Sequence, residues 1–286
     1  MRAENYSREE LMVSVCSRFV KDYDCVFVGI GVPLLAATVA SRAHAPNCLL
    51  MFEGGGIGPI SRRVILSVGD NSTTDNALSA TELWRALGDV QKGYVDLGVI
   101  GGAQIDKFGN LNSTVILSGK ADYFNPTVRL GGSGGANDIA SSVKRLIIIM
   151  RLEKRRFVQK LDYVTTPGFL GGGDERERAG LLGGGPEAVV TNRCIFRFDP
   201  QTREMYVDEV FPGISVEEIQ ENVGWDLKIS PDLKETLPPS LEEIQIMRSV
   251  DPMNIFLGSK SKIESETFED FYTTLKAAYE SSIMLL

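Results

Sequence analysis

Apolar and polar positions alternate along the first part of the chain in a way that predicts helices and strands in turn. The stretch "SREE" is typical of a capping box, and apolar residues follow it at helical spacing, so we expect a helix over 8–22. A short apolar run predicts a strand over 25–29, and Pro33 suits the first turn of a helix over 33–43. The run "CLLMFE" predicts a second strand over 48–53. This strand–helix–strand order implies parallel pairing with a right-handed crossover.

The same alternation continues to about residue 150. The stretch "SATELWRALGDVQKG" predicts a helix, "YVDLGVIGG" a strand, "GGSGGANDIASSVKR" a glycine loop that leads into a helix, and "LIIIM" a fully buried strand. We therefore predict an α/β fold with an open, mostly parallel layered sheet and helices on both faces. In such sheets ligands bind at the carboxyl ends of the strands, where this chain collects its glycines.

The last third of the chain has a different pattern. Two β-rich runs, "AVVTNRCIFRF" and "EMYVDEVF", flank "DPQT" and predict a hairpin. Two acidic helices follow, "SVEEIQENVG" and "SLEEIQIMRSV", each opened by Ser-x-x-Glu. Because no linker or low-complexity tract interrupts the sequence, we predict a single domain over 1–286, with 186–286 as a β-hairpin and acidic helical extension.

Charge and cysteine content narrow the function classes. A net charge of −8 argues against nucleic acid or anionic lipid as a partner. The N-terminus is charged where a signal peptide would be apolar, and the apolar runs fall short of the ~18 residues of a membrane span. The four cysteines lack C-x-x-C spacing and are typical of reduced thiols. We expect a cytoplasmic protein without a membrane segment.

Several kinds of catalytic site can be set aside. His44 is the only histidine, so a histidine-based triad or a multi-histidine metal site is excluded, and we expect no metal and no cofactor. The stretch "VGIGVPLLA" has two glycines of a dinucleotide-binding fingerprint, but Leu34 stands where the third is required. His44 is expected at the surface.

The stretch "LLMFEGGGIGP" places a carboxylate, Glu53, at the end of an apolar run and directly before three glycines. A carboxylate beside backbone that a ligand can approach closely is placed to act as a nucleophile or base. The alternative is that Glu53 caps a loop or pairs with Arg62 or Arg63. The stretch "LGGSGGAND" at 130–138 offers backbone N–H groups suited to an oxyanion, or forms only a tight turn. The residues alone leave these alternatives open.

Six stretches together resemble the β subunits of family I coenzyme A transferases, most closely the glutaconate type. In chain order they are "VGIGVPLLAATVASRAHAPN", "CLLMFEGG", "IGGAQIDKFGNLNST", "GGSGGAND", "MRLEKRRFVQKLDYVTTPGF" and "AVVTNRCIFRF". The resemblance implies a CoA-transferase/NagB-like fold and puts the family's catalytic glutamate on Glu53. The loop beyond it departs from the family, which usually has Glu-Ser-Gly or Glu-Asn-Gly and a later proline than Pro59. Substrate identity is therefore open.

The resemblance also implies a mechanism and a partner. The mechanism is ping-pong transfer through a glutamyl-CoA thioester on Glu53, with coenzyme A as a substrate moiety and not a cofactor. The partner is a separately encoded α subunit, and the substrates are an acyl-CoA and a carboxylic acid. The groups expected to bind the oxyanion or acyl-CoA are Gly31, Gly134, Gly135 and Ala136.

Other interpretations remain at this point. Relatives on this scaffold act as acyl-CoA decarboxylases or ring-opening hydrolases, but those have replaced the glutamate that this chain retains as Glu53. The chain could also be a non-catalytic partner subunit. The basic cluster of Lys154, Arg155 and Arg156 is expected to be a solvated or interface surface and not a ligand site.

Overall fold

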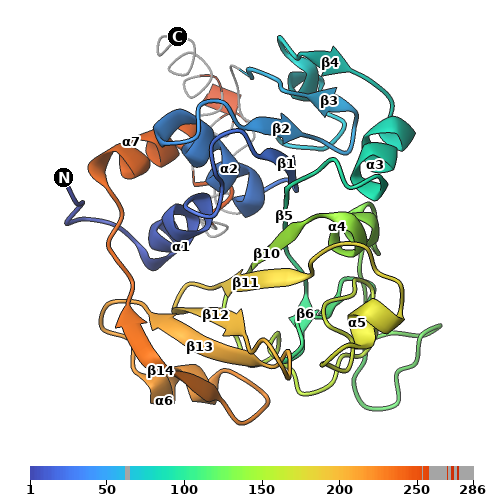
Figure 1. The fold of residues 1–286 in the computed structure, drawn as a ribbon. Helices are drawn as coiled ribbons and strands as arrows, with labels where there is room; N and C mark the ends of the chain where they lie inside the picture. Colours follow the sequence, from blue (N-terminus) through green and yellow to red (C-terminus); the bar gives the residue numbers. More distant parts are fainter. Residues whose placement is uncertain (62–64, 253, 258–268, 270–271, 274–275, 277–286) are drawn as a thin grey trace. The chain divides into compact units, whose positions relative to one another are not determined.

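The computed structural model describes residues 1–61, 65–252, 254–257, 269, 272–273 and 276. The chain forms two compact units, a first unit of residues 1–86 and 238–286 and a second unit of residues 87–237 (Figure 1). The expected extension over 186–286 divides between them at Pro238. The organisation of the whole chain as one domain stays a prediction.

The first unit contains the predicted strand–helix–strand element. Strand β1 (Cys25–Val28) is followed by helix α2 (Val32–Ala43) and strand β2 (Leu49–Met51). β1 and β2 pair in parallel, with Cys25 opposite Leu49 and Phe27 opposite Met51, as predicted. β2 then pairs antiparallel with β3 (Gly56–Ile57), and β3 pairs antiparallel with β4 (Ser79–Ala80). A 3₁₀ turn, η1 (Asn71–Thr74), lies between β3 and β4 in the chain.

Helix α1 (Arg8–Ser17) begins with the capping box that the sequence predicts. The Glu10 N–H donates to the Ser7 hydroxyl, and the Ser7 N–H donates to the Glu10 carboxylate. The helix is shorter than the predicted 8–22, because the N–H groups of Phe19 and Val20 bond to the carbonyls three residues back, as in a 3₁₀ turn, and not four residues back. His44, just after α2, is exposed as expected, and its ring hydrogen-bonds to the Val20 carbonyl.

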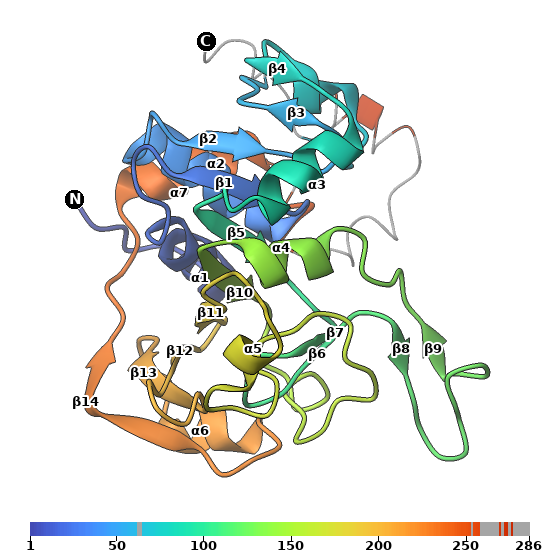
Figure 2. The same cartoon turned by 45° about the vertical axis from the view of Figure 1, so that its right-hand side comes forward.

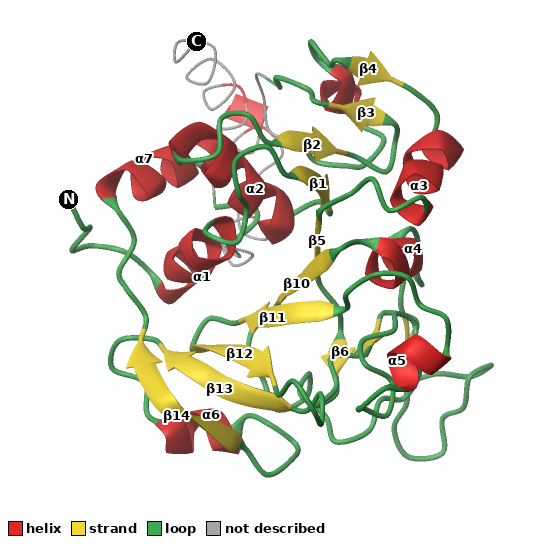
Figure 3. Cartoon of the chain, in the orientation of Figure 1, coloured by secondary structure: helices red, strands yellow, loops and turns green. Residues whose placement is uncertain are grey.

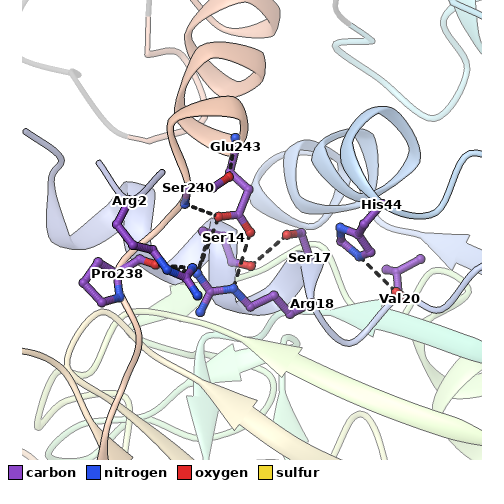
Figure 4. Close-up of polar contacts among 9 residues, drawn as sticks. All are labelled: Arg2, Ser14, Ser17, Arg18, Val20, His44, Pro238, Ser240 and Glu243. Atoms are coloured by element: carbon purple, nitrogen blue, oxygen red, sulfur yellow. Dashed lines mark hydrogen bonds and ion pairs between the residues drawn. The ribbon is translucent and has the colours of Figure 1, made fainter. Parts of the chain in front are cut away.

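Helix α7 (Leu241–Val250) joins the first unit through two reciprocal ion pairs with α1. Arg18, at the end of α1, pairs with Glu243 in the first turn of α7 (Figure 4). Arg248, in the last turn of α7, pairs with Glu10 in the first turn of α1. The two helices are therefore antiparallel. Each of these glutamates is also the acidic member of its own helix's capping box.

The pKa of both glutamates is set by two opposing effects. Burial raises the pKa of Glu10 and of Glu243, but the hydrogen bonds from arginine, serine and backbone outweigh burial and hold each pKa below its ordinary value. Next to this junction the N-terminal segment contacts the residues just before α7, because the Ala3 N–H donates to the Pro239 carbonyl and the Arg2 guanidinium to that of Pro238 (Figure 4).

The second unit holds the longer part of the sheet, in the order β14-β13-β12-β11-β10-β5. Strands β5 (Leu97–Ile100), β10 (Arg145–Ile149) and β11 (Pro186–Val190) pair in parallel. Their apolar, mostly buried sequences fit strands that are covered on both faces. Strands β12 (Cys194–Phe198) and β13 (Met205–Val210) form the predicted antiparallel hairpin. The β-rich run "AVVTNRCIFRF" contains the end of β11 and all of β12, so it forms parts of two strands.

The sequence did not predict the remaining strands of the second unit. Strand β14 (Lys228–Glu235) is polar, contains Pro231, and lies at the edge of the sheet beside β13. Two small sheets pair β6 (Gln104–Ile105) with β7 (Leu111–Asn112), and β8 (Val115–Ile116) with β9 (Val128–Arg129). Figure 2 shows β8 and β9 in a projecting arm.

Short helices complete the fold (Figure 3). They are α3 (Leu83–Gln91), which spans the boundary of the two units, and α4 (Ala136–Ser142), α5 (Glu175–Arg178) and α6 (Val216–Glu221). The predicted class, an open and mostly parallel α/β sheet with helices, is confirmed. Within the described ranges, no helix is both long and apolar enough to cross a membrane.

Candidate active site

Glu53 lies in a tight hairpin turn between β2 and β3. The Gly55 N–H donates to the Phe52 carbonyl at 2.9 Å, and the Phe52 N–H donates to the Gly56 carbonyl at 2.9 Å. This pattern gives a three-residue loop, Glu53 to Gly55, with Gly55 at a φ of +101°. The prediction that the strand continues through Glu53 is wrong, because β2 ends at Met51 and the chain reverses directly after the buried Phe52.

The three positions after Glu53 are glycine for a steric reason. A Cβ atom on Gly54 would lie 2.2 Å from the Val68 carbonyl oxygen, and one on Gly55 would lie 1.9 Å from that of Thr81. A Cβ on Gly56 would lie 1.8 Å from the Thr73 carbonyl oxygen. All three distances are far below van der Waals contact, so only glycine lets the backbone of 68–81 pack this closely around the turn.

Gly31 lies at the same sheet edge as Glu53. β1 and β2 are parallel and in register, so the chain leaves both strands at their shared carboxyl edge. Gly31 is the N-cap of α2 with a φ of +93°, and no atom lies within 4 Å of the position that a Cβ would take. Glu53 is half-buried at this sheet edge. The suggested partners Arg62 and Arg63 lie outside the described residues.

The second glycine run, Gly131 to Gly135, lies in the second unit and is named the glycine loop. Its φ angles are +85° at Gly132 and +49° at Gly134. Ser113 holds the loop through two bonds to Gly132, since the Gly132 N–H donates to the Ser113 carbonyl at 2.9 Å and the Ser113 hydroxyl to the Gly132 carbonyl at 2.9 Å. A Cβ on Gly131 or Gly132 would meet no atom within 4 Å. The loop is therefore fixed and open.

The three predicted groups at the end of this loop differ in their surroundings. Gly134 is exposed, whereas Gly135 is buried and is the N-cap of α4. The Ala136 N–H donates to the Ser133 carbonyl at 3.0 Å, so this donor is already engaged inside the loop. Glu53 and Gly31 thus lie together in the first unit, and Gly134, Gly135 and Ala136 together in the second. That the two groups act on one substrate stays a prediction.

Sequence reasoning missed the residues that support the glycine loop. Besides Ser113, Asn137 donates from its side chain to the Thr165 carbonyl at 3.1 Å, and the Thr165 hydroxyl accepts from the Ser113 N–H at 2.9 Å. The stretches "NLNST" and "YVTTPGF" that contain Ser113 and Thr165 stood out in the sequence only as parts of the resemblance. Hydrophobic periodicity carries no signal for such bonds.

Two cavities lie within the separate units. One of about 460 Å³ in the first unit is lined largely by apolar side chains, including Leu34, Leu50 and Phe52, and by Arg42. Glu53 is not among the described residues that line it. One of about 620 Å³ in the second unit is lined by Lys107, Lys154, Lys228 and Glu204, among others.

Two residues of the basic cluster, Lys154 and Arg155, are exposed, as predicted for a solvated surface, whereas Arg156 is half-buried; that the cluster is not a ligand site stays a prediction. Arg155 and Arg156 both pair with Glu153, and the Arg155 side chain is 75% exposed. Lys154 is exposed at the rim of the second cavity. In the described part of the chain, no three His, Cys, Asp or Glu side chains gather where they could hold a metal ion.

Comparisons with known proteins place the chain in a family. A model of the Coenzyme A transferase family matches residues 10–222. The chain is 38% identical over 249 residues to the β subunit of the 3-oxoadipate CoA-transferase of Pseudomonas knackmussii, a match that covers 86% of this chain and 94% of that protein. It is 38% identical over 259 residues to the β subunit of the glutaconate CoA-transferase of Acidaminococcus fermentans, a match that covers 88% of this chain and 96% of that protein.

The fold agrees with these sequence matches. The crystal structure of glutaconate coenzyme A-transferase from Acidaminococcus fermentans superposes on this chain with a TM-score of 0.81, covering 89% of this chain and 98% of the crystallised chain. The family model and the two relatives cover most of the chain. The protein therefore belongs to the coenzyme A transferase family.

Proposed function

We propose that this chain is the β subunit of an acyl-CoA:carboxylate CoA-transferase, in which Glu53 carries coenzyme A as a glutamyl thioester. The observation that carries the proposal is the position of Glu53. It is a half-buried carboxylate at the carboxyl edge of β2, on a turn that three close-packed glycines fix in place. Both relatives at 38% identity are named CoA-transferases, which supports the same chemistry here.

In the first half-reaction a Glu53 carboxylate oxygen attacks the thioester carbonyl carbon of the acyl-CoA. The C–S bond breaks, CoA leaves as a thiolate, and Glu53 is left in a mixed anhydride with the acyl group. The thiolate then attacks the glutamyl carbonyl carbon and expels the donor acid as its carboxylate. Glu53 now holds CoA as a thioester, and one of its oxygens has left with the acid.

The second half-reaction reverses these steps with another acid. The acceptor carboxylate attacks the glutamyl carbonyl and expels the CoA thiolate, which then attacks the acceptor's acyl carbon and frees Glu53. Each step passes through a tetrahedral oxyanion, and one well-placed N–H donor is worth ~3 kcal/mol to it. We assign such donation to the glycine loop at Gly134 and Gly135, with Gly31 lining the acyl-CoA path at the Glu53 edge. Ala136 serves as a donor only if its bond to Ser133 opens.

The relatives' names guide the proposed substrates and partner. Both names denote one subunit of an enzyme built from more than one, so we propose an α subunit that assembles with this chain. Glutaconate and 3-oxoadipate are short dicarboxylic acids, and we propose an acid of similar size. Four free cysteines without a disulfide agree with the proposed cytoplasmic location.

The deciding experiment uses the chain co-purified with its α subunit. Incubation with an acyl-CoA and no acceptor should add to this chain the mass of CoA less one water, and peptide mapping should place it on Glu53. Glu53→Gln should remove the adduct and lower turnover at least ~1000-fold, with Tm unchanged within a degree or so, because the substitution keeps the side-chain volume. Glu53→Asp should also form no adduct and show the same loss of turnover, since its carboxylate lies ~1.5 Å further from the substrate.

The matched control is Glu9→Gln, a half-buried glutamate of the same unit outside the sheet edge. It should form the adduct at the wild-type rate. An adduct on another residue, or normal turnover of Glu53→Gln, would refute the nucleophile. Release of carbon dioxide or of ring-opened acid without transfer would favour the decarboxylase or hydrolase alternative, and the absence of any chemistry would favour a non-catalytic role.

A further inference from the structure

Arg176 is a buried arginine in a stretch, "GGDERERAG", that looks exposed in the sequence. The residue is 4% exposed, although α5 around it consists of charged residues. Four backbone carbonyls accept its hydrogen bonds. Nε donates to Gly183 at 2.9 Å, Nη1 to Gly168 at 2.8 Å, and Nη2 to Ala140 at 2.6 Å and to Ser141 at 3.3 Å.

No carboxylate forms an ion pair with Arg176 in the part of the chain that the structure describes. Burial lowers the pKa of Arg176 to about 10, which leaves the guanidinium charged at neutral pH. Among the described residues, the dipoles of these four carbonyls offset this charge. Two of those carbonyls, Ala140 and Ser141, belong to the last turn of α4, where a helix leaves carbonyls unpaired and carries partial negative charge. Arg176 therefore caps α4 at its C-terminal end.

A third glycine run completes this contact. The Gly183 N–H donates to the Ser141 carbonyl at 2.7 Å, and the Gly184 N–H to the Val143 carbonyl at 3.2 Å. A Cβ on Gly183 would lie 2.3 Å from the Val143 carbonyl oxygen, and one on Gly185 would lie 3.2 Å from the Arg176 Nε. The run "GGGP" is thus packed around the end of α4 and leaves space for the guanidinium.

The segment from Thr165 to Gly168 connects both ends of α4. The Thr165 carbonyl accepts from Asn137 in the first turn of α4, and the Gly168 carbonyl accepts from Arg176, which binds the last turn. The glycine loop leads directly into this helix. A movement of α4 would therefore move the loop, and among the residues that the structure describes Arg176 is the side chain that joins Gly168, Gly183 and α4.

We propose that Arg176 is a positioning residue of the transferase: by binding the end of α4 to the 165–168 segment and to Gly183, it fixes the glycine loop where the oxyanion forms. This inference rests on the proposed function. It assigns to Arg176 no contact with substrate. Its effect passes through α4, so the loss of Arg176 slows formation of the glutamyl-CoA adduct more than it weakens acyl-CoA binding.

The test compares three variants of the assembled heteromer. Arg176→Met keeps most of the side-chain length and loses every donor, whereas Arg176→Lys keeps the charge but not the planar fork that reaches several carbonyls. The control is Arg193→Met, because Arg193 also links separate elements of the second unit, donating to Glu218 and to the Leu152 carbonyl, without contacting α4. Two quantities are measured on each, hydrogen–deuterium exchange over residues 131–142 and the rate of CoA adduct formation.

We expect Arg176→Met to speed exchange over 131–142 and to slow adduct formation about 100-fold, as a displacement near 1 Å in a preorganised site does, with the acyl-CoA KM changed less than about threefold. In both the exchange rate and the rate of adduct formation, Arg176→Lys should lie between Arg176→Met and wild type. Arg193→Met should lower Tm but leave the adduct rate within about twofold. If Arg176→Met fails to assemble, Arg176→Lys alone must show both changes.

A lowered Tm with wild-type adduct rate in the Arg176 variants would show a purely structural role and overturn the inference. Wild-type exchange over 131–142 in those variants would overturn it as well. Failure of the proposed function looks different, because the wild-type heteromer itself would then form no adduct at Glu53.

Discussion

The glycines after Glu53 and those of the glycine loop look alike in the sequence but meet opposite surroundings. At Gly54, Gly55 and Gly56 the space that a Cβ would need is already filled by carbonyl oxygens, none further than 2.2 Å away. At Gly131 and Gly132 no atom lies within 4 Å of that position. The first run must be glycine because other parts of the protein pack directly against its backbone. The second run is glycine because of its backbone angles or because a ligand approaches its backbone.

This difference separates two requirements of the proposed chemistry. A nucleophile must be held at a fixed position, and the crowded turn provides that for Glu53. An oxyanion donor must be reachable by the substrate, and the open space beside Gly131 and Gly132 would give the substrate access to the glycine loop. A glycine run by itself therefore does not identify a ligand site. The atoms that a Cβ would meet at each glycine show whether the residue is required by close packing or leaves space for a ligand.

The largest effect on stability is expected from Gly55→Ala. The new Cβ would lie 1.9 Å from the Thr81 carbonyl oxygen, and the φ of +101° strains any residue other than glycine. Together these should destabilise the protein by about 4 kcal/mol, which lowers Tm by about 10 °C. Differential scanning calorimetry measures this, with Gly69→Ala as control, because Gly69 lies in the same unit with open space around it. Equal melting of the two variants would contradict the crowded turn.

An intermediate effect is expected from Gly132→Ala. Its φ of +85° is unfavourable for alanine, but the space beside it is open, so only the backbone strain of about 1–2 kcal/mol remains. Tm should fall by about 2–8 °C, again by calorimetry. A fall in Tm as large as that of Gly55→Ala would mean that the glycine loop is crowded in the assembled protein. The contrast between a crowded turn and an open loop would then be wrong.

Much of the fold follows from local sequence. Spacing alone predicted the capping boxes of Ser7 with Glu10 and Ser240 with Glu243, and both are present. At the third such motif, only half of the box forms: the Ser215 hydroxyl accepts from the Glu218 N–H, while the Glu218 carboxylate pairs with Arg193. A partner 25 residues away cannot be predicted from a four-residue motif.

The wrong and the missing predictions have the same cause, because each depends on contacts with residues outside the local stretch of sequence. The apolar run through Phe52 predicted a longer strand, but carbonyls between Val68 and Thr81 fix the turn at Glu53. Arg176 lies in a charged stretch and is buried because three separate segments, one of them 36 residues away in sequence, supply carbonyls to it. The sequence thus located the candidate nucleophile through its resemblance to a family, whereas the contacts that hold Glu53 and the glycine loop required the folded chain.

The smallest effect on stability, and the sharpest test of access, is expected from Gly131→Ala. Neither a positive φ nor a nearby atom opposes the new methyl group, so the free energy of unfolding should change by less than about 0.5 kcal/mol. If the open space beside Gly131 receives the thioester, the same methyl group should slow CoA adduct formation about tenfold, because it displaces the reacting carbonyl from its donors. Calorimetry and the adduct rate are measured on one preparation, with Gly69→Ala again as the control that should change neither. An unchanged adduct rate would show that substrate does not use this space and that the glycine loop is only a tight turn, whereas a lowered Tm would show that the space is filled when the α subunit is bound.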